Sequence, residues 1–138
     1  MNNRAIQIAE RYRQIEPKLL EYQRPHTKQL IRSLYRSRDG LDLSDTGTGK
    51  TFCALAVAHA LGLKDTLVVC PASLTRFWWL VAERMGVAEP MAVSYEMLRS
   101  GRTECGHFEM IKTPRMKKPR HVFHWHFNPN DWLIIFDE

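Results

Sequence analysis

The segment best suited to chemistry is a glycine-rich stretch ending in Gly-Lys-Thr. It reads Ser-Asp-Thr-Gly-Thr-Gly-Lys-Thr over residues 44–51. Glycines let a backbone curl so that several N–H groups face one anion, and a following helix adds its positive N-terminal dipole. Lys50 would reach the β- and γ-phosphates of a nucleotide, and the Thr51 hydroxyl would bind Mg²⁺. The alternative is an ordinary strand-to-helix turn with a surface Lys-Thr pair.

One position departs from the usual phosphate-loop pattern, because Ser44 stands where the first glycine is expected. The flanking residues support the pattern. Leu41 and Leu43 predict a short strand leading into the loop, and an apolar run over 50–61 predicts a helix closed by Gly62. We predict that the nucleotide site is lined by Asp45, Thr46, Gly47, Thr48, Gly49, Lys50 and Thr51.

Two carboxylates follow an apolar strand-like run at 132–136, namely Asp137 and Glu138. In open α/β sheets the carboxyl ends of the strands form the edge where ligands bind. We predict that Asp137 holds Mg²⁺ and that Glu138 orients the water that attacks the γ-phosphate. The alternative is a strand that simply ends in two solvated acids.

The remaining patterns alternate between helices and strands, which favours a doubly wound, mostly parallel α/β sheet with helices on both faces. Beyond the elements above, helices are predicted at 5–16, 25–38 and 74–85, and strands at 66–70 and 91–93. The second of these helices should bury Leu30, Ile31, Leu34 and Tyr35. The aromatic cluster at 77–79 is expected to pack in the core.

Residues 101–131 interrupt this alternation and predict an inserted β-hairpin with a basic tip. Its cations are expected to contact nucleic-acid phosphates, although such a run can also be merely solvated. They are Lys112, Arg115, Lys117, Lys118 and Arg120.

The insert also contains Cys105, His107, His121, His124 and His126. Two ligand pairs could meet across a hairpin, but the spacing matches no zinc signature. Surface or DNA-facing roles are therefore favoured over metal binding.

Composition bounds the remaining possibilities. The 138 residues, 44% of them hydrophobic and 25% charged, predict one globular domain without a membrane-spanning run. A net charge of +5 suits a polyanionic partner. Cys53, Cys70 and Cys105 show neither disulfide nor metal spacing, and no secretory signal opens the chain. We expect a cytoplasmic protein with no membrane partner.

Five segments, in order, resemble the motifs of the first RecA-like lobe of superfamily-two helicases, most closely the Swi/Snf-type DNA translocases and their phage-encoded relatives. Residues 19–23 resemble the opening whose glutamine recognises adenine, with Glu21 in place of the usual proline. Residues 45–51 resemble motif I, which in this family often lacks the first glycine. Residues 67–74, followed by Trp78, resemble motif Ia, 93–98 motif Ib, and 134–138 the start of the Asp-Glu-x-His motif II.

The resemblance implies a P-loop lobe over 1–138 that binds ATP and Mg²⁺, with a helical extension at 1–24. It implies that Gln23 recognises adenine and that motif Ia lies along the DNA backbone. Ser73 and Thr75 stand at the start of the helix of motif Ia. Their hydroxyl and N–H groups could bind a phosphate, or Ser73 could only cap the helix. Partners would be double-stranded DNA and a second RecA-like lobe, and the location the host cytoplasm if the gene is phage-encoded.

In this family ATP binds between two lobes, and the second lobe supplies the arginine finger. A first lobe alone is therefore expected to bind nucleotide weakly, to hydrolyse it very slowly and to make no directional movement. One alternative is a non-catalytic DNA-binding or regulatory module that keeps the lobe. Another is a small-molecule kinase, which would leave motifs Ia and Ib unexplained.

Overall fold

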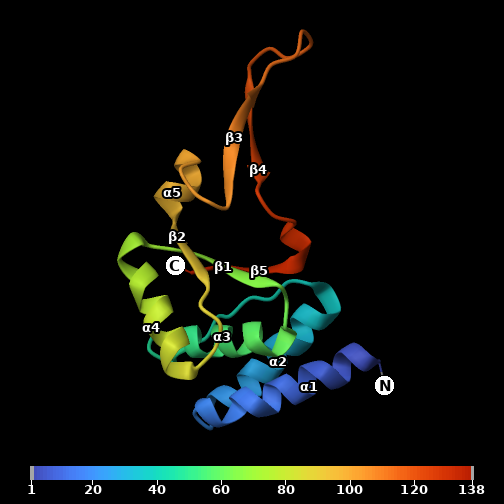
Figure 1. The fold of residues 1–138 in the computed structure, drawn as a ribbon, viewed down its shortest axis with the longest axis vertical. Coiled ribbons are helices and arrows are strands. Elements are labelled where there is room, and N and C mark those ends of the chain that lie inside the picture. Colours follow the sequence, from blue (N-terminus) through green and yellow to red (C-terminus); the bar gives the residue numbers. More distant parts are fainter. Residues whose placement is uncertain (1, 138) are drawn as a thin grey trace.

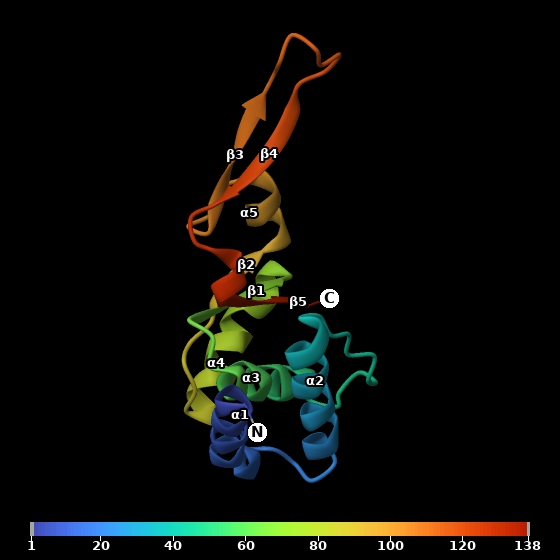
Figure 2. The ribbon, with the colours of Figure 1, turned by 90° about the vertical axis from the view of Figure 1, so that its right-hand side faces the viewer.

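The structure is a computed structural model that describes residues 2–137 (Figures 1 and 2). A small parallel sheet lies between a layer of helices and the base of a projecting hairpin. The helices are α1 (Asn3–Ile15), α2 (Gln23–Ser37), α3 (Lys50–Leu61), α4 (Thr75–Met85) and α5 (Tyr95–Ser100). The strands are β1 (Asp65–Cys70), β2 (Met91–Ser94), β3 (Gly106–Ile111), β4 (Arg120–Trp125) and β5 (Trp132–Phe136).

Helix α1 shows how the local sequence sets the ends of an element. The side chain of Asn2 accepts a hydrogen bond from the backbone N–H of Arg4 and so caps the first turn. The α-helix gives way to a 3₁₀ turn at Glu16–Lys18, where Pro17 cannot donate to the helical ladder. The buried residues of α1, which are Ile8, Tyr12 and Ile15, recur at helical spacing. The result is an amphipathic helix that packs on α3.

The central sheet has the order β2-β1-β5, with both pairs parallel. One face contributes side chains such as Val68, Cys70 and Leu133 to a core that α3, α4, α1 and α2 complete. Helix α3 is buried on several sides, as expected for a helix enclosed between the sheet and two outer helices. Figure 2 shows α1 on the side of α3 that faces away from the sheet, with α2 running upward beside α3.

Helices were predicted on both faces of the sheet. Among the described residues, the opposite face is instead covered mainly by the base of the antiparallel β3–β4 hairpin, together with the single short helix α5. Leu67, Val69 and Val93 pack there against Cys105, which is fully buried. A chain of aromatic contacts continues from the hairpin into the sheet and ends where Phe127 stacks on Trp132 at 3.9 Å between ring centroids. The insert is thus part of the core at its base, while its far end projects (Figure 1).

Most predicted elements are present, although α2 begins two residues before Pro25. The predicted strand at 41–43 is wrong, because this segment is not a strand and Leu41 and Leu43 are 76% and 82% exposed. None of the described strands pairs with it. The predicted burial of Tyr35 is also wrong: its ring is 41% exposed and its hydroxyl accepts from Asn2.

Among residues 2–137, no helix has the length and apolar character required to cross a bilayer.

Gly106 tests whether the hairpin base belongs to the core. A Cβ there would lie 2.5 Å from the backbone oxygen of His124 and would also contact the ring of Phe123. We expect Gly106→Ala to lower the free energy of unfolding by about 1–3 kcal/mol, because backbone cannot move aside cheaply. Urea denaturation provides the measurement.

Gly40→Ala is the matched control, since its Cβ would meet Leu34 at an ordinary 3.5 Å. If both variants unfolded at the wild-type urea concentration, the close packing of the hairpin base would be wrong.

Candidate functional site

The glycine-rich segment runs directly into the N-terminus of α3. Gly49 precedes the helix, and both Gly47 and Gly49 have positive φ angles, 79° and 82°. Residues other than glycine rarely adopt this backbone conformation. Lys50 and Thr51 form the first turn of α3 and are half-buried, and the first N–H groups of any helix lack partners within it. This arrangement can receive an anion.

Ser44, the departure from the glycine pattern, has a structural role. Its hydroxyl donates to Asp42 Oδ1 at 2.6 Å, and its backbone N–H donates to the same oxygen at 2.9 Å. The Thr48 hydroxyl lies 3.1 Å from Ser44 Oγ and 2.7 Å from the carbonyl oxygen of Asp45, and can donate its proton to either. A glycine could not make the side-chain bonds that brace the two ends of this loop.

Asp42 also pairs with His26 in α2, whose Nε2 lies 3.0 Å from Asp42 Oδ1. Partial burial acts to raise the pKa of Asp42, but hydrogen bonds from Ser44 and His26 outweigh it and hold the pKa below its usual value. The carboxylate is therefore charged at neutral pH, and it fixes the start of the loop to α2.

Gln23 makes a second connection between α2 and the loop. The side chain is only 4% exposed. Its Nε2 donates to the carbonyl oxygen of Thr48 at 2.9 Å, and its Oε1 accepts from the backbone N–H of Leu20 at 2.9 Å. A Cβ on Gly49 would collide with this amide. Sequence reasoning missed this contact between Gln23 and the loop, and adenine recognition by Gln23 stays a prediction.

Asp137 follows β5 at the carboxyl edge of the sheet and is held by three neighbours. Its backbone N–H donates to the carbonyl oxygen of Val69 at 2.8 Å, and its own carbonyl oxygen accepts from the Tyr95 hydroxyl at 2.7 Å. Its Oδ2 accepts from the indole Nε1 of Trp78 at 3.0 Å. Burial, with the nearby Asp137 charge, raises the pKa of the Cys70 thiol. Glu138 lies outside the described residues.

The glycine-rich loop and the carboxyl end of β5 lie on the same side of the molecule, the right-hand side in Figure 2. No hydrogen bond or ion pair within residues 2–137 joins Asp137 to the loop. Asp45, Thr46 and Gly47 are exposed, so the loop forms an open surface.

Two hollows of the described surface lie elsewhere, and neither includes the loop or Asp137. One, of about 290 Å³, is lined by residues such as Arg11 and His59. The other, of about 490 Å³, lies beside β2 and is lined by residues such as Trp79 and Trp132.

The predicted motif Ia contacts lie near the same sheet edge, in the turn between β1 and α4. Ser73 is exposed, and Thr75 is the first residue of α4. The cap position is taken by Leu74 without a side-chain hydrogen bond, so the alternative role of Ser73 as a helix cap is wrong. The Thr75 hydroxyl donates to the carbonyl oxygen of Ala72 at 3.0 Å.

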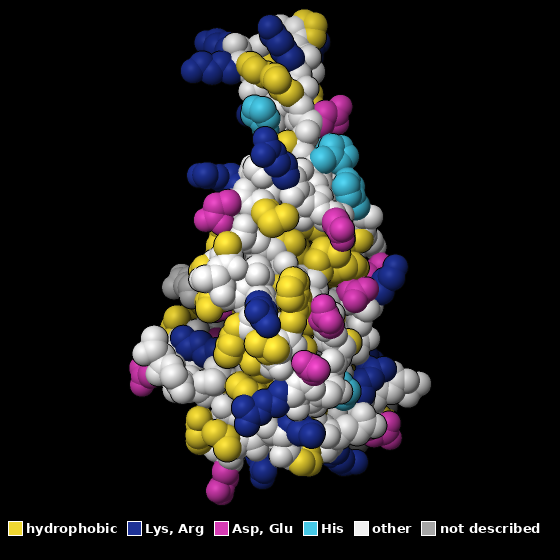
Figure 3. Space-filling model, turned by 60° about the vertical axis from the view of Figure 1, so that its left-hand side comes forward, with side chains coloured by type: hydrophobic (Ala, Val, Ile, Leu, Met, Phe, Trp, Pro, Cys, Tyr) yellow, Lys and Arg dark blue, Asp and Glu magenta, His cyan; other side chains and the backbone are white. Residues whose placement is uncertain are grey.

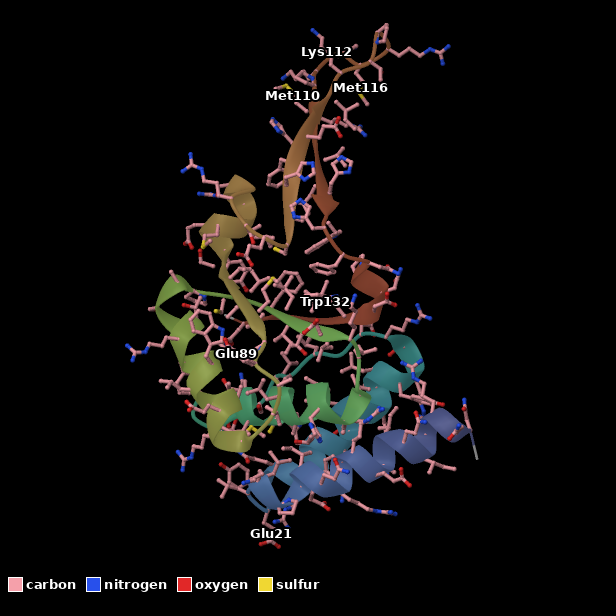
Figure 4. All side chains as sticks on the ribbon, in the orientation of Figure 1. Glu21, Glu89, Met110, Lys112, Met116 and Trp132 are labelled. Carbon is pink, nitrogen blue, oxygen red and sulfur yellow. The ribbon has the colours of Figure 1, made fainter. Side chains whose placement is uncertain are left out.

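The basic residues of the insert gather at its far end. Figure 3 shows Lys and Arg side chains there, with histidines nearer the body, and Figure 4 places Lys112 beside Met110 and Met116. Five predicted contact residues are exposed and form no ion pair within residues 2–137: Lys112, Arg115, Lys117, Lys118 and Arg120.

The histidines lower in the hairpin bond to one another and to neighbouring groups. His107 Nδ1 lies 2.9 Å from His126 Nε2, and His124 Nε2 lies 2.8 Å from a carboxylate oxygen of Glu109. Cys105 is buried and contacts Thr103 instead. In the described part of the chain, no group of three or more such side chains is arranged to hold a metal ion.

Comparison with known proteins gives one informative match. The chain is 38% identical, over 130 residues, to a protein of Acanthamoeba polyphaga mimivirus that carries the name "Putative ATP-dependent RNA helicase". The match covers 88% of this chain but 24% of that protein, so the chain spans about a quarter of its relative's length. No family model and no solved structure matches the chain significantly. The likeness is to a helicase-type protein.

The carboxylate of Asp42 allows a test of how the loop is held. Its pKa in the folded state lies below the unfolded value of about 3.9, so its stabilisation is present above about pH 4 and is lost as pH falls through the folded pKa. We expect Asp42→Asn to lower the free energy of unfolding by about 1–2 kcal/mol at pH 7. The difference from wild type should shrink towards pH 3 in urea denaturation.

Asp39→Asn removes an exposed carboxylate that forms no ion pair within residues 2–137, and should have little effect at any pH. A loss for Asp42→Asn that stayed constant with pH would contradict the ionic explanation.

Proposed function

We propose that this chain is the nucleotide-binding lobe of an ATP-dependent nucleic-acid motor of the superfamily-two, Swi/Snf-like type, with DNA as its track. The main support is the Gly-Lys-Thr loop at the N-terminus of α3, which side chains from α2 brace on one side. The likeness to a helicase-named protein is consistent with this proposal. The complete motor activity would also require a second RecA-like lobe.

The residues present suit Mg²⁺-bound ATP. Lys50 and Thr51 lie in the first turn of α3, where N–H groups and the helix dipole favour phosphate. Asp137 has one oxygen bonded to Trp78, and none of the described hydrogen bonds uses the other oxygen. Lys50 would bind the β- and γ-phosphates, and Thr51 and Asp137 would hold the metal, which neutralises charge on the phosphates. Glu138 would orient the attacking water.

Nucleic acid would bind at Ser73 and Thr75 and at the basic end of the insert. The projecting shape of the hairpin gives its cations access to a backbone beyond the body of the molecule (Figures 1 and 3). RNA is the second candidate track, because the relative's name specifies an RNA helicase. DNA is favoured here by the motif Ia and Ib resemblance. A non-catalytic binding module would bind nucleic acid without turnover.

The phosphate-site assignment makes a direct prediction. Lys50→Ala should weaken binding of ATP with Mg²⁺ by at least about tenfold in calorimetric titration, because the variant loses the cation that faces the phosphates. Lys64→Ala is the charge-matched control, since Lys64 is exposed and lies between the C-terminal end of α3 and β1. An unchanged affinity in Lys50→Ala would contradict the assignment of the phosphate site and the proposed function that depends on it.

The hairpin assignment predicts a salt-dependent effect. Replacing Lys117 and Lys118 together by Ala should weaken binding to a short DNA duplex and reduce the slope of log K against log salt by about 2, because two phosphate contacts are lost. Fluorescence anisotropy at several salt concentrations measures both quantities.

The control replaces Lys18 and Lys64, which are also exposed but lie on the body of the molecule. Equal slopes for the two double variants would assign the hairpin cations to solvation alone. A parallel titration with duplex RNA distinguishes the tracks, because clearly tighter RNA binding would favour the second candidate.

A further inference from the structure

We propose that Trp78 is a positioning residue that fixes the carboxylate of Asp137 in the orientation needed for metal binding. The inference rests on the proposed function and concerns the same site. It adds a role for an aromatic residue of α4 that its apolar surroundings in the sequence would assign to packing alone.

The contact between these residues is specific in its atoms. The indole Nε1–H of Trp78 donates to Asp137 Oδ2 at 3.0 Å, although the residues are 59 positions apart in the chain. Trp78 is 2% exposed, and a buried indole N–H without an acceptor would be costly. An indole nitrogen only donates and a carboxylate only accepts, so the bond has one possible direction. It engages Oδ2 and leaves Oδ1 as the oxygen open to a cation.

The backbone on both sides of this carboxylate is also fixed. The N–H of Asp137 donates to Val69 in β1, and its carbonyl oxygen accepts from Tyr95 in α5. With backbone and Oδ2 both held, little rotational freedom remains for Asp137. Removing the indole N–H would release the side chain, and binding a metal would then cost the entropy of ordering it again.

Trp79 provides an internal comparison. It is the next residue in α4 and has the same chemistry, but its Nε1 donates to the carbonyl oxygen of Pro90 at 3.1 Å, and its side chain is 39% exposed. Substitution of either tryptophan by phenylalanine removes one indole N–H and retains an aromatic ring. Only Trp78→Phe removes a bond to Asp137.

The test uses the 138-residue chain and measures ATP affinity by calorimetry, once with Mg²⁺ and once with EDTA. We expect Trp78→Phe to weaken binding about tenfold with Mg²⁺ and less than about twofold with EDTA, because only the metal-dependent part uses Asp137. Trp79→Phe should match wild type under both conditions. Urea denaturation of each variant confirms that it is folded.

Equal weakening of Trp78→Phe with Mg²⁺ and with EDTA would show a structural role only and would overturn the inference. Wild-type affinity under both conditions would overturn it as well. If the wild-type chain itself binds no ATP, the proposed function fails, and the inference fails with it. These results are distinguishable because the last appears in the unsubstituted protein.

A measurement on the wild type covers the case in which Trp78→Phe does not fold. The indole N–H signals in ¹⁵N-edited NMR spectra report each of the four tryptophans separately. The variants Trp79→Phe, Trp125→Phe and Trp132→Phe each assign one signal by its loss, and the remaining signal belongs to Trp78. The Trp78 signal should shift more on addition of ATP with Mg²⁺ than of ATP with EDTA, while the Trp79 signal stays in place. Identical shifts of the Trp78 signal in the two titrations would contradict the proposal.

Discussion

The fold depends on the need to bury both faces of a short, three-stranded parallel sheet. Strands buried on both faces are typical of such sheets, because neither face can remain in contact with water. Here α3 and α4 cover one face, and the hairpin base with α5 covers the other. The same covering elements meet Asp137, since Trp78 comes from α4 and Tyr95 from α5. The elements that bury the sheet therefore also fix the position of Asp137.

The glycine-rich loop is held in a different way. The segment before the loop is not a strand, so side-chain hydrogen bonds rather than sheet pairing fix the loop. Asp42 and Ser44 bond to each other at one end, and Gln23 donates to the carbonyl oxygen of Thr48 at the other. Both connections lead to α2, which carries His26 and Gln23 on successive turns. The serine that weakens the match to the consensus is thus one of the residues that shape the loop.

Local patterns predicted much of this architecture, and tertiary contacts decided the rest. Helical spacing, glycine stops and the hairpin pattern depend on near neighbours and gave α1, α3 and the β3–β4 pair. The alternation of Leu41 and Leu43 predicted a strand wrongly, because strand formation needs a partner that periodicity does not reveal. Sequence motifs were enough to select Lys50 and Asp137 as candidate site residues. The hydrogen bond from Trp78 to Asp137 joins residues 59 positions apart, and no local sequence pattern indicates it. Ser44 could have been noticed only as an exception.

One edge of the sheet has a physical consequence of its own. Within residues 2–137, β5 pairs only with β1, so its other edge offers backbone donors and acceptors, and Phe136 beside it is 66% exposed. Leu41 and Leu43 are more exposed still. Such an edge is a template for adding a further strand, from the same polypeptide or from a neighbouring molecule. A strand or loop that covered this edge would therefore satisfy its unpaired backbone groups and remove a route to self-association.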